Sequence, residues 1–144
     1  MPIDSAARSR RGYLVVDRFQ RAFQIWSVLA LAARNRQVLT YDLLSHLIGV
    51  PRMGLGQMLE PIQSYCILNR LPALTSLVVS EESGVPGQGF IAAHDVPREQ
   101  GRVFNHDWLG QISPNEEVLQ QAAERLPTNG RPLVQLQEEL DFGG

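Results

Sequence analysis

The sequence has no lysine, a single cysteine and no long apolar run. Without about 18 consecutive apolar residues a membrane-spanning helix is not expected, and the polar N-terminal stretch does not indicate a signal peptide. Cys66 has no second cysteine to pair with, which agrees with a reducing compartment. We therefore expect a cytoplasmic protein. A chain of 144 residues that is 44% hydrophobic can form one core without disulfides or a metal.

Because lysine is absent, every basic residue is arginine. Its planar guanidinium pairs bidentately with phosphate or guanine edges, although a compositional bias of the coding genome explains the absence equally well. Residues 1–72 hold nine arginines and four acidic residues, a net charge of +5. Residues 73–144 hold four arginines and eleven acidic residues, a net charge of −7. An anionic partner is expected on the first half.

A long amphipathic helix is predicted over residues 15–33, where apolar residues such as Phe19 and Trp26 recur at helical spacing. Arg34 and Arg36 stand at its end. Positive charge is favourable there because of the helix dipole, and the same two side chains are candidates for phosphate contacts.

A second helix is predicted from Thr40, a good N-cap, to Gly49, which suits a left-handed helix end. Its inward-facing residues are expected to be Leu43, Leu44 and Leu47. Pro51 suits the first turn of a third helix over residues 51–67. Two helices joined by so short a turn indicate a helix-turn-helix.

The third helix has an apolar stripe and an opposite face suited to DNA contact. The stripe consists of Leu55, Met58, Leu59, Ile62 and Cys66. Gly54 and Gly56 are unfavourable in an exposed helix, so we expect close packing against a neighbouring helix or a sugar-phosphate backbone. Pro61 is expected to kink the helix or to begin a new one.

After the third helix the pattern changes to that of strands and turns. A buried strand over 74–79, a Gly-rich turn over 80–89 and a returning strand over 90–92 predict a two-stranded wing. A further short strand is predicted over 102–104 and a helix over 114–125.

These elements predict an α+β fold, mostly α. We expect a winged helix-turn-helix domain over residues 13–126, with a long N-terminal helix and a small β-hairpin wing. Residues 1–12 are predicted to be a flexible basic arm, and residues 127–144 a partly ordered acidic tail.

The order of several short motifs resembles the C-terminal domain of alkylguanine-DNA alkyltransferases and the non-catalytic alkyltransferase-like proteins. The matching residues are Thr40-Tyr41, Gly49-Val50-Pro51, Gly56, Leu71-Pro72, Val78-Val79, Ser83-Gly84 and Gly87-Gln88-Gly89-Phe90. The resemblance covers about residues 22–91. It implies a winged helix that binds DNA, with Tyr41 against the backbone of a flipped nucleotide.

The chain departs from the family motif P-C-H-R-V-V. The stretch from Pro72 to Val78-Val79 is two residues longer and contains neither the nucleophilic cysteine nor the His-Arg pair. Alkyl transfer needs an activated thiolate, so that activity is not expected. The arginine that the family inserts into the duplex aligns with Met53, and Arg52 stands one position away.

The first hypothesis is therefore a non-enzymatic protein that binds duplex DNA, with modified bases as candidate targets, and uses no cofactor. The expected contacts are Arg34, Arg36, Thr40, Tyr41, Arg52, Met53 and Gln57. The alternative is a protein-interaction adaptor, in which the acidic second half binds a partner protein or a second copy.

Other chemistry has weaker support. His94-Asp95 and His106-Asp107 suggest a metal-dependent hydrolase, but neither pair has the spacing of a strong motif. Cys66 lies on the apolar stripe and is expected in the core, and His46 on the surface. No metal site is expected, and no P-loop or dinucleotide-binding motif is present.

Overall fold

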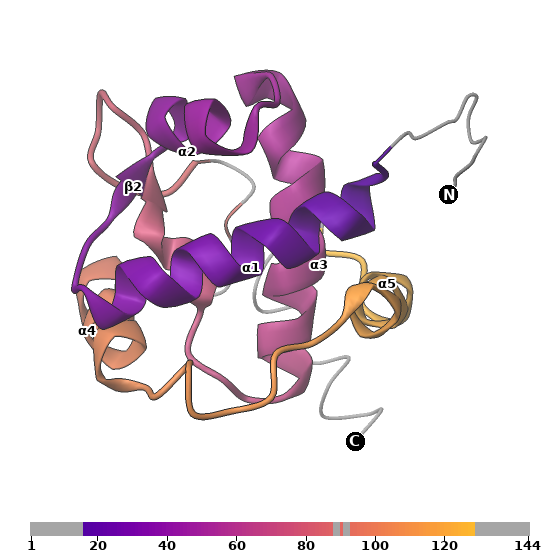
Figure 1. Cartoon of the computed structure of the whole chain (residues 1–144). Helices are drawn as coiled ribbons and strands as arrows, with labels where there is room; N and C mark the ends of the chain where they lie inside the picture. The colour runs from indigo at the N-terminus through magenta and orange to yellow at the C-terminus, as the bar shows by residue number, and fades with distance from the viewer. Residues whose placement is uncertain (1–15, 88–89, 91–92, 129–144) are drawn as a thin grey trace.

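The computed structural model describes residues 16–87, 90 and 93–128. The predicted basic arm and nearly all of the predicted acidic tail lie outside these residues. The described part is mostly helical, with a small parallel two-stranded sheet (Figure 1). None of its helices is long and apolar enough to cross a membrane.

Helix α1 (Arg18–Arg34) crosses α3 (Leu55–Leu68) (Figure 1). Residues of both helices form much of the core, and residues of the other segments complete it. Asp17 caps α1 by accepting hydrogen bonds from the first backbone N–H groups, and Gln20 completes the capping box. Trp26 is fully buried, and its ring meets those of Tyr65 and Trp108 edge-on at 5.6 Å. Such aromatic pairs stabilise the core beyond the burial of their area.

The second predicted helix is confirmed as α2 (Tyr41–Ile48). Thr40 caps it, and Gly49 ends it at φ +78°, a left-handed conformation that favours glycine. The predicted inward stripe is wrong in two of three positions. Leu44 is fully buried, whereas Leu43 and Leu47 are 44% and 54% exposed, because this short helix packs through one edge only.

The third predicted helix is confirmed as a one-turn 3₁₀ helix, η1 (Arg52–Gly54), that leads into α3. Pro61 neither ends α3 nor begins a new helix. The expected packing of Gly54 and Gly56 against a neighbouring helix is wrong, and their packing against a sugar-phosphate backbone stays a prediction. No atom of another described segment lies within 4 Å of the position that a Cβ would take at either glycine.

The predicted strand over 74–79 is confirmed only at its end. It begins as a 3₁₀ turn, η2 (Leu74–Leu77), and continues as β3 (Val78–Val79), which pairs in parallel with β2 (Leu39–Thr40). The hairpin wing is not confirmed. Phe90 is not in a strand, and residues 91–92 lie outside the described part of the chain.

The predicted strand over 102–104 is wrong, because these residues belong to α4 (Val96–Asn105). Asp95 caps this helix and Pro97 occupies its first turn, two helix-start signals that outweigh the two strand-forming residues Val103 and Phe104. The last predicted helix is confirmed as α5 (Glu116–Arg125), which packs against α1 and α3.

Candidate functional site

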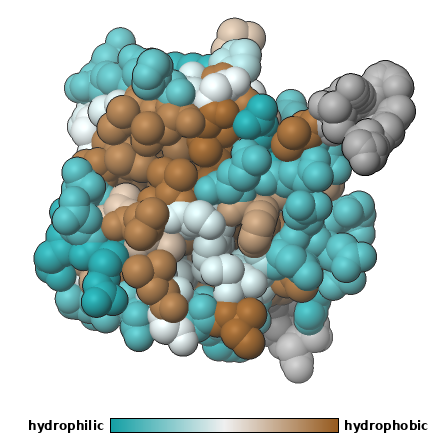
Figure 2. Space-filling view, viewed as in Figure 1, coloured by the Kyte–Doolittle hydropathy of each residue, from teal (hydrophilic) through white to brown (hydrophobic). Residues whose placement is uncertain are grey.

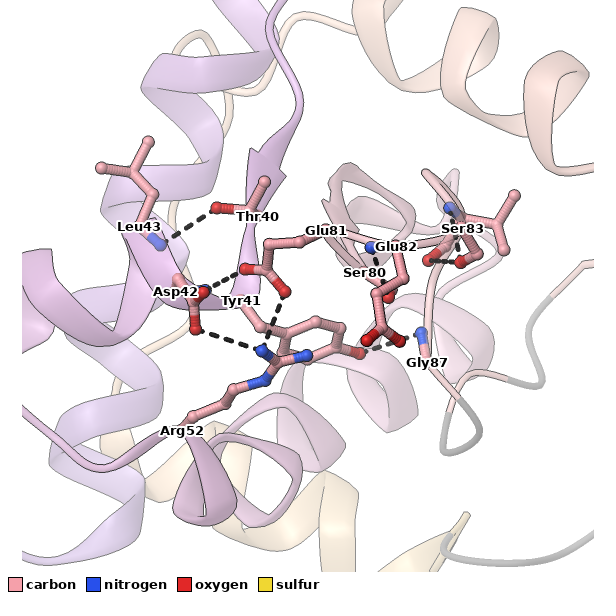
Figure 3. Close-up of polar contacts among 11 residues, drawn as sticks. Thr40, Tyr41, Asp42, Leu43, Arg52, Ser80, Glu81, Glu82, Ser83 and Gly87 are labelled. Atoms are coloured by element: carbon pink, nitrogen blue, oxygen red, sulfur yellow. Dashed lines mark hydrogen bonds and ion pairs between the residues drawn. The ribbon is translucent and has the colours of Figure 1, made fainter.

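The start of α2 is capped from two sides. The Thr40 hydroxyl accepts a hydrogen bond from Leu43 N at 3.1 Å. The Glu81 carboxylate, from the segment after β3, accepts one from Asp42 N at 2.6 Å (Figure 3). Two of the free N–H groups at this helix end are therefore satisfied within the chain. Thr40 acts as a cap in this structure, and its hydroxyl does not extend from the surface as an unpaired group.

Arg52, the first residue of η1, lies against this capped helix end. Its Nη1 is 3.1 Å from Asp42 Oδ1 and 2.9 Å from Glu81 Oε1. The guanidinium carbon lies 5.7 Å from the centre of the Tyr41 ring, within the range of a cation–π contact (Figure 3). The Asp42 N–H, and to a lesser extent the Arg52 charge, lower the pKa of Glu81.

Tyr41 joins α2 to the segment 80–87, which we call the Glu81 loop. The Tyr41 hydroxyl accepts a hydrogen bond from Gly87 N at 3.0 Å. A Cβ at position 87 would lie 2.7 Å from that hydroxyl oxygen, so a glycine allows this close approach. The loop also has its own backbone bonds, from Ser80 N to Val85 O and from Gly84 N to Ser80 O.

A pocket of about 230 Å³ opens beside Tyr41. Its lining residues come from α2, η1, α3, η2 and the segments near Phe90 and Thr128: Tyr41, Met53, Gly56, Gln57, Leu59, Glu60, Gln63, Thr75, Phe90 and Thr128. Gly56 helps to keep it open, since no side chain projects there. The volume is below the roughly 300–1,000 Å³ typical of drug-sized ligands, so the pocket suits a smaller group.

Thr75, one of the lining residues, has a buried hydroxyl with no partner within the described part of the chain. Thr75 is 5% exposed, and its Oγ1 makes no hydrogen bond to any described residue. A buried hydroxyl without a hydrogen bond is unfavourable. Thr75 was not among the predicted site residues, because it stands in an apolar stretch that is typical of a strand.

The base of the pocket is held by contacts between α3 and Thr128. Gln63 Nε2 donates to Thr128 Oγ1, and Thr128 N donates to Glu60 Oε2, both at 3.0 Å. Arg18 pairs with Glu60 at 3.3 Å. Nothing in the sequence signals these contacts, because Thr128 stands more than 60 positions after its partners.

Tyr41, Met53 and Gln57 are the predicted site residues that the pocket brings together. Met53 is 95% exposed at the start of the α3 segment. Arg34 and Arg36 lie at the other end of α1, beside α4. Arg34 is 3.9 Å from Asp107, and Arg36 donates to Asn105 Oδ1 at 3.3 Å. The structure does not group these two arginines with Tyr41 and Arg52.

The residues of the other predicted chemistry are dispersed. Cys66 is buried, which raises the pKa of its thiol to about 12, and it does not line the pocket. His46 is exposed, as predicted. Asp95 caps α4 and Asp107 accepts from Gly110 N. Among the described residues no three His, Cys, Asp or Glu side chains form a group that could hold a metal ion.

Outside the pocket, apolar side chains gather in a broad area over α1 and α2 (Figure 2). The exposed apolar residues of these helices and of the segment between them include Phe23, Leu31, Val38, Leu43 and Leu47.

Comparison of the chain with protein-family models, with curated proteins and with solved structures gives no match.

Proposed function

We propose that this protein binds duplex DNA without catalysing a reaction, and that the pocket beside Tyr41 receives a base, modified bases included. The observation that supports the proposal most is the pocket itself. Three of its lining residues, Tyr41 of α2, Met53 of η1 and Gln57 of α3, are among the expected DNA contacts.

The lining has the chemistry that recognises a base removed from its stack. Proteins that take up such a base place it between aromatic or apolar side chains and form hydrogen bonds to its edge. Tyr41, Phe90 and Met53 supply the first kind of group. Gln57 supplies the second.

The absence of an activated nucleophile among the described lining residues supports binding without reaction. In the motif P-C-H-R-V-V the cysteine stands three residues before the Val-Val pair, and Thr75 stands three residues before Val78. A threonine hydroxyl needs an adjacent base to become a nucleophile. No described histidine lines the pocket, and the Glu60 carboxylate, which does line it, pairs with Arg18 and accepts a hydrogen bond from Thr128 N.

The test is fluorescence anisotropy with labelled duplex and single-stranded DNA, plain or with one alkylated guanine, at two salt concentrations. We expect salt-sensitive binding that is tighter for the modified duplex. Gly56→Leu is expected to abolish that preference by filling the pocket, because the space around Gly56 accepts a side chain.

Gly101→Leu is the matched control, because Gly101 lies within α4 and also has no described atom within 4 Å of its Cβ position. It should bind both duplexes as the wild type does. If the wild type binds no DNA at low salt, the proposal is rejected. If Gly56→Leu keeps the preference, binding occurs without the pocket.

The apolar area over α1 and α2 favours a second candidate, a protein-interaction adaptor (Figure 2). Exposed apolar patches of this kind often mark protein contacts. Light scattering of the wild type and of the Leu43→Glu/Leu47→Glu variant tests self-association. A dimer that the variant abolishes would favour the adaptor, and a wild-type monomer would argue against self-association.

A further inference from the structure

The Glu81 carboxylate occupies a place suited to an anionic ligand. One oxygen accepts a hydrogen bond from Asp42 N in the first turn of α2, and the other lies 2.9 Å from Arg52 Nη1. A backbone N–H at a helix start and an arginine are the two kinds of donor that commonly bind phosphate. Glu81 therefore holds both donors as a bound phosphate would hold them (Figure 3).

Arg52 would keep its position if Glu81 moved away. Asp42 Oδ1 lies 3.1 Å from the same nitrogen, and the Tyr41 ring lies beside the guanidinium. The Arg52 side chain is 47% exposed, so an anion in solution can reach it. Both ion pairs are at least partly exposed to solvent, and such pairs contribute little stability.

The same carboxylate holds one end of the Glu81 loop, and the bond from Gly87 N to the Tyr41 hydroxyl holds the other. Phe90, three residues beyond Gly87, lines the pocket. Displacement of Glu81 would release the loop at its first attachment to α2.

We propose that Glu81 is an internal competitor for DNA phosphate, which must displace its carboxylate before Arg52 can bind the duplex backbone. This inference rests on the proposed function. Glu81 then lowers the affinity for any DNA, whereas the pocket selects among bases.

The test compares wild type, Glu81→Gln and Glu82→Gln in anisotropy titrations with one plain duplex. Glu82 is the matched control, because it is the neighbouring exposed acid and its removal changes the net charge by the same amount. The glutamine side chain in Glu81→Gln can still accept from Asp42 N, so the cap of α2 is retained. Thermal melting checks that all variants fold.

We expect Glu81→Gln to bind about two- to fivefold more tightly than Glu82→Gln, the range for release of an exposed ion pair. In an Arg52→Gln background, Glu81→Gln should change the affinity for DNA no more than Glu82→Gln does. This double-mutant comparison remains valid if one variant is moderately destabilised.

Equal binding by Glu81→Gln and Glu82→Gln, with clear binding by wild type, would overturn the inference and leave the proposed function intact. An effect of Glu81→Gln that persists without Arg52 would also overturn it. If neither wild type nor Glu81→Gln binds any DNA at low salt, the proposed function fails and the inference fails with it. If Glu81→Gln binds DNA and the wild type does not, the result would support both the proposed function and the inference.

Discussion

Arg18 Nη1 donates a hydrogen bond to the Gln57 carbonyl oxygen at 2.8 Å. This is the oxygen that an N–H at position 61 would bind in an α-helix, and Pro61 has no N–H. Arg18 also pairs with Glu60 at 3.3 Å. The first turn of α1 thus compensates for a proline inside α3, which explains why the helix continues through it.

Replacement of Arg18 should therefore destabilise the fold through α3. We expect Arg18→Met to lower the free energy of unfolding by about 1–2 kcal/mol, since a carbonyl oxygen and the Glu60 carboxylate both lose a donor. Urea denaturation monitored by tryptophan fluorescence measures this loss. In a Pro61→Ala background the loss should be smaller, because the alanine introduced there donates its own N–H to the Gln57 oxygen. Equal losses in the two backgrounds would contradict the explanation.

Cys66 should make stability depend on pH in the alkaline range. Burial raises the pKa of its thiol from 9.0 to about 12, and the Glu99 carboxylate adds to the increase. Below about pH 9 the thiol is protonated in both states and stability is unaffected. Above that pH the unfolded thiol ionises first, so the unfolding free energy falls by about 1.4 kcal/mol per pH unit until the folded thiol also ionises.

Cys66→Ala provides the control for that measurement, because other groups titrate in the same range. The difference between the wild-type and variant stability curves should be flat below pH 9 and should slope above it. A thiol reagent at pH 8 should label the wild type only as fast as the protein unfolds. If the stability curves of the wild type and Cys66→Ala stay parallel up to pH 11, the buried thiol of Cys66 does not cause the loss of stability.

Local signals in the sequence were sufficient to predict the elements around the site. A capping threonine and a glycine in a left-handed conformation set the ends of α2, and the apolar stripe of α3 is buried or half-buried as expected. These features depend on neighbours within one or two helical turns. The exposure of Arg52, Met53 and Gln57 followed from the same periodicity.

Contacts between distant segments were not predictable. Glu81 meets Asp42 across 39 positions, and Gln63 meets Thr128 across 65. No alternation of apolar and polar residues encodes such pairs, since they depend on how helices and loops pack in three dimensions. Gln63 and Thr128 line the pocket, whereas the predicted phosphate contacts at Arg34 and Arg36 came from charge alone.

Glu99 is a buried acid that anchors α4 to the segment before η2. Its Oε2 accepts a hydrogen bond from Ala73 N at 2.6 Å, and its Oε1 accepts from Arg102 Nη1 at 2.8 Å. Glu99→Ala would leave the buried Ala73 N–H unsatisfied. We expect it to cost about 1–3 kcal/mol of unfolding free energy, the penalty for an unpaired buried donor.

Gln100→Ala is the comparison for Glu99→Ala. Gln100 Nε2 donates to Ser76 O at 2.8 Å from the same helix, but its side chain is only half-buried and uncharged. Its loss should cost about 0.5–1.5 kcal/mol, the range for an ordinary hydrogen bond. Urea denaturation of both variants shows which of them loses more unfolding free energy. A larger loss for Gln100→Ala would mean that Glu99 is not the anchor.

Gly87→Ala should loosen the Glu81 loop. The new Cβ would lie 2.7 Å from the Tyr41 hydroxyl oxygen and 3.2 Å from Tyr41 Cζ, so the ring or the loop must move and the bond between them weakens. We expect a stability loss of about 1 kcal/mol and faster hydrogen exchange at the loop amides, with little change in α1 and α3. Gly101→Ala is the control, since a helical glycine in open space should gain up to about 1 kcal/mol.

The Tyr41→Phe background separates this contact from any intrinsic effect of alanine at position 87. Phenylalanine lacks the hydroxyl that the new Cβ would meet first, and it makes no hydrogen bond to Gly87 N. The added cost of Gly87→Ala should therefore be smaller in Tyr41→Phe than in the wild type. An equal cost in both would mean that the loop backbone rather than the Tyr41 hydroxyl requires glycine.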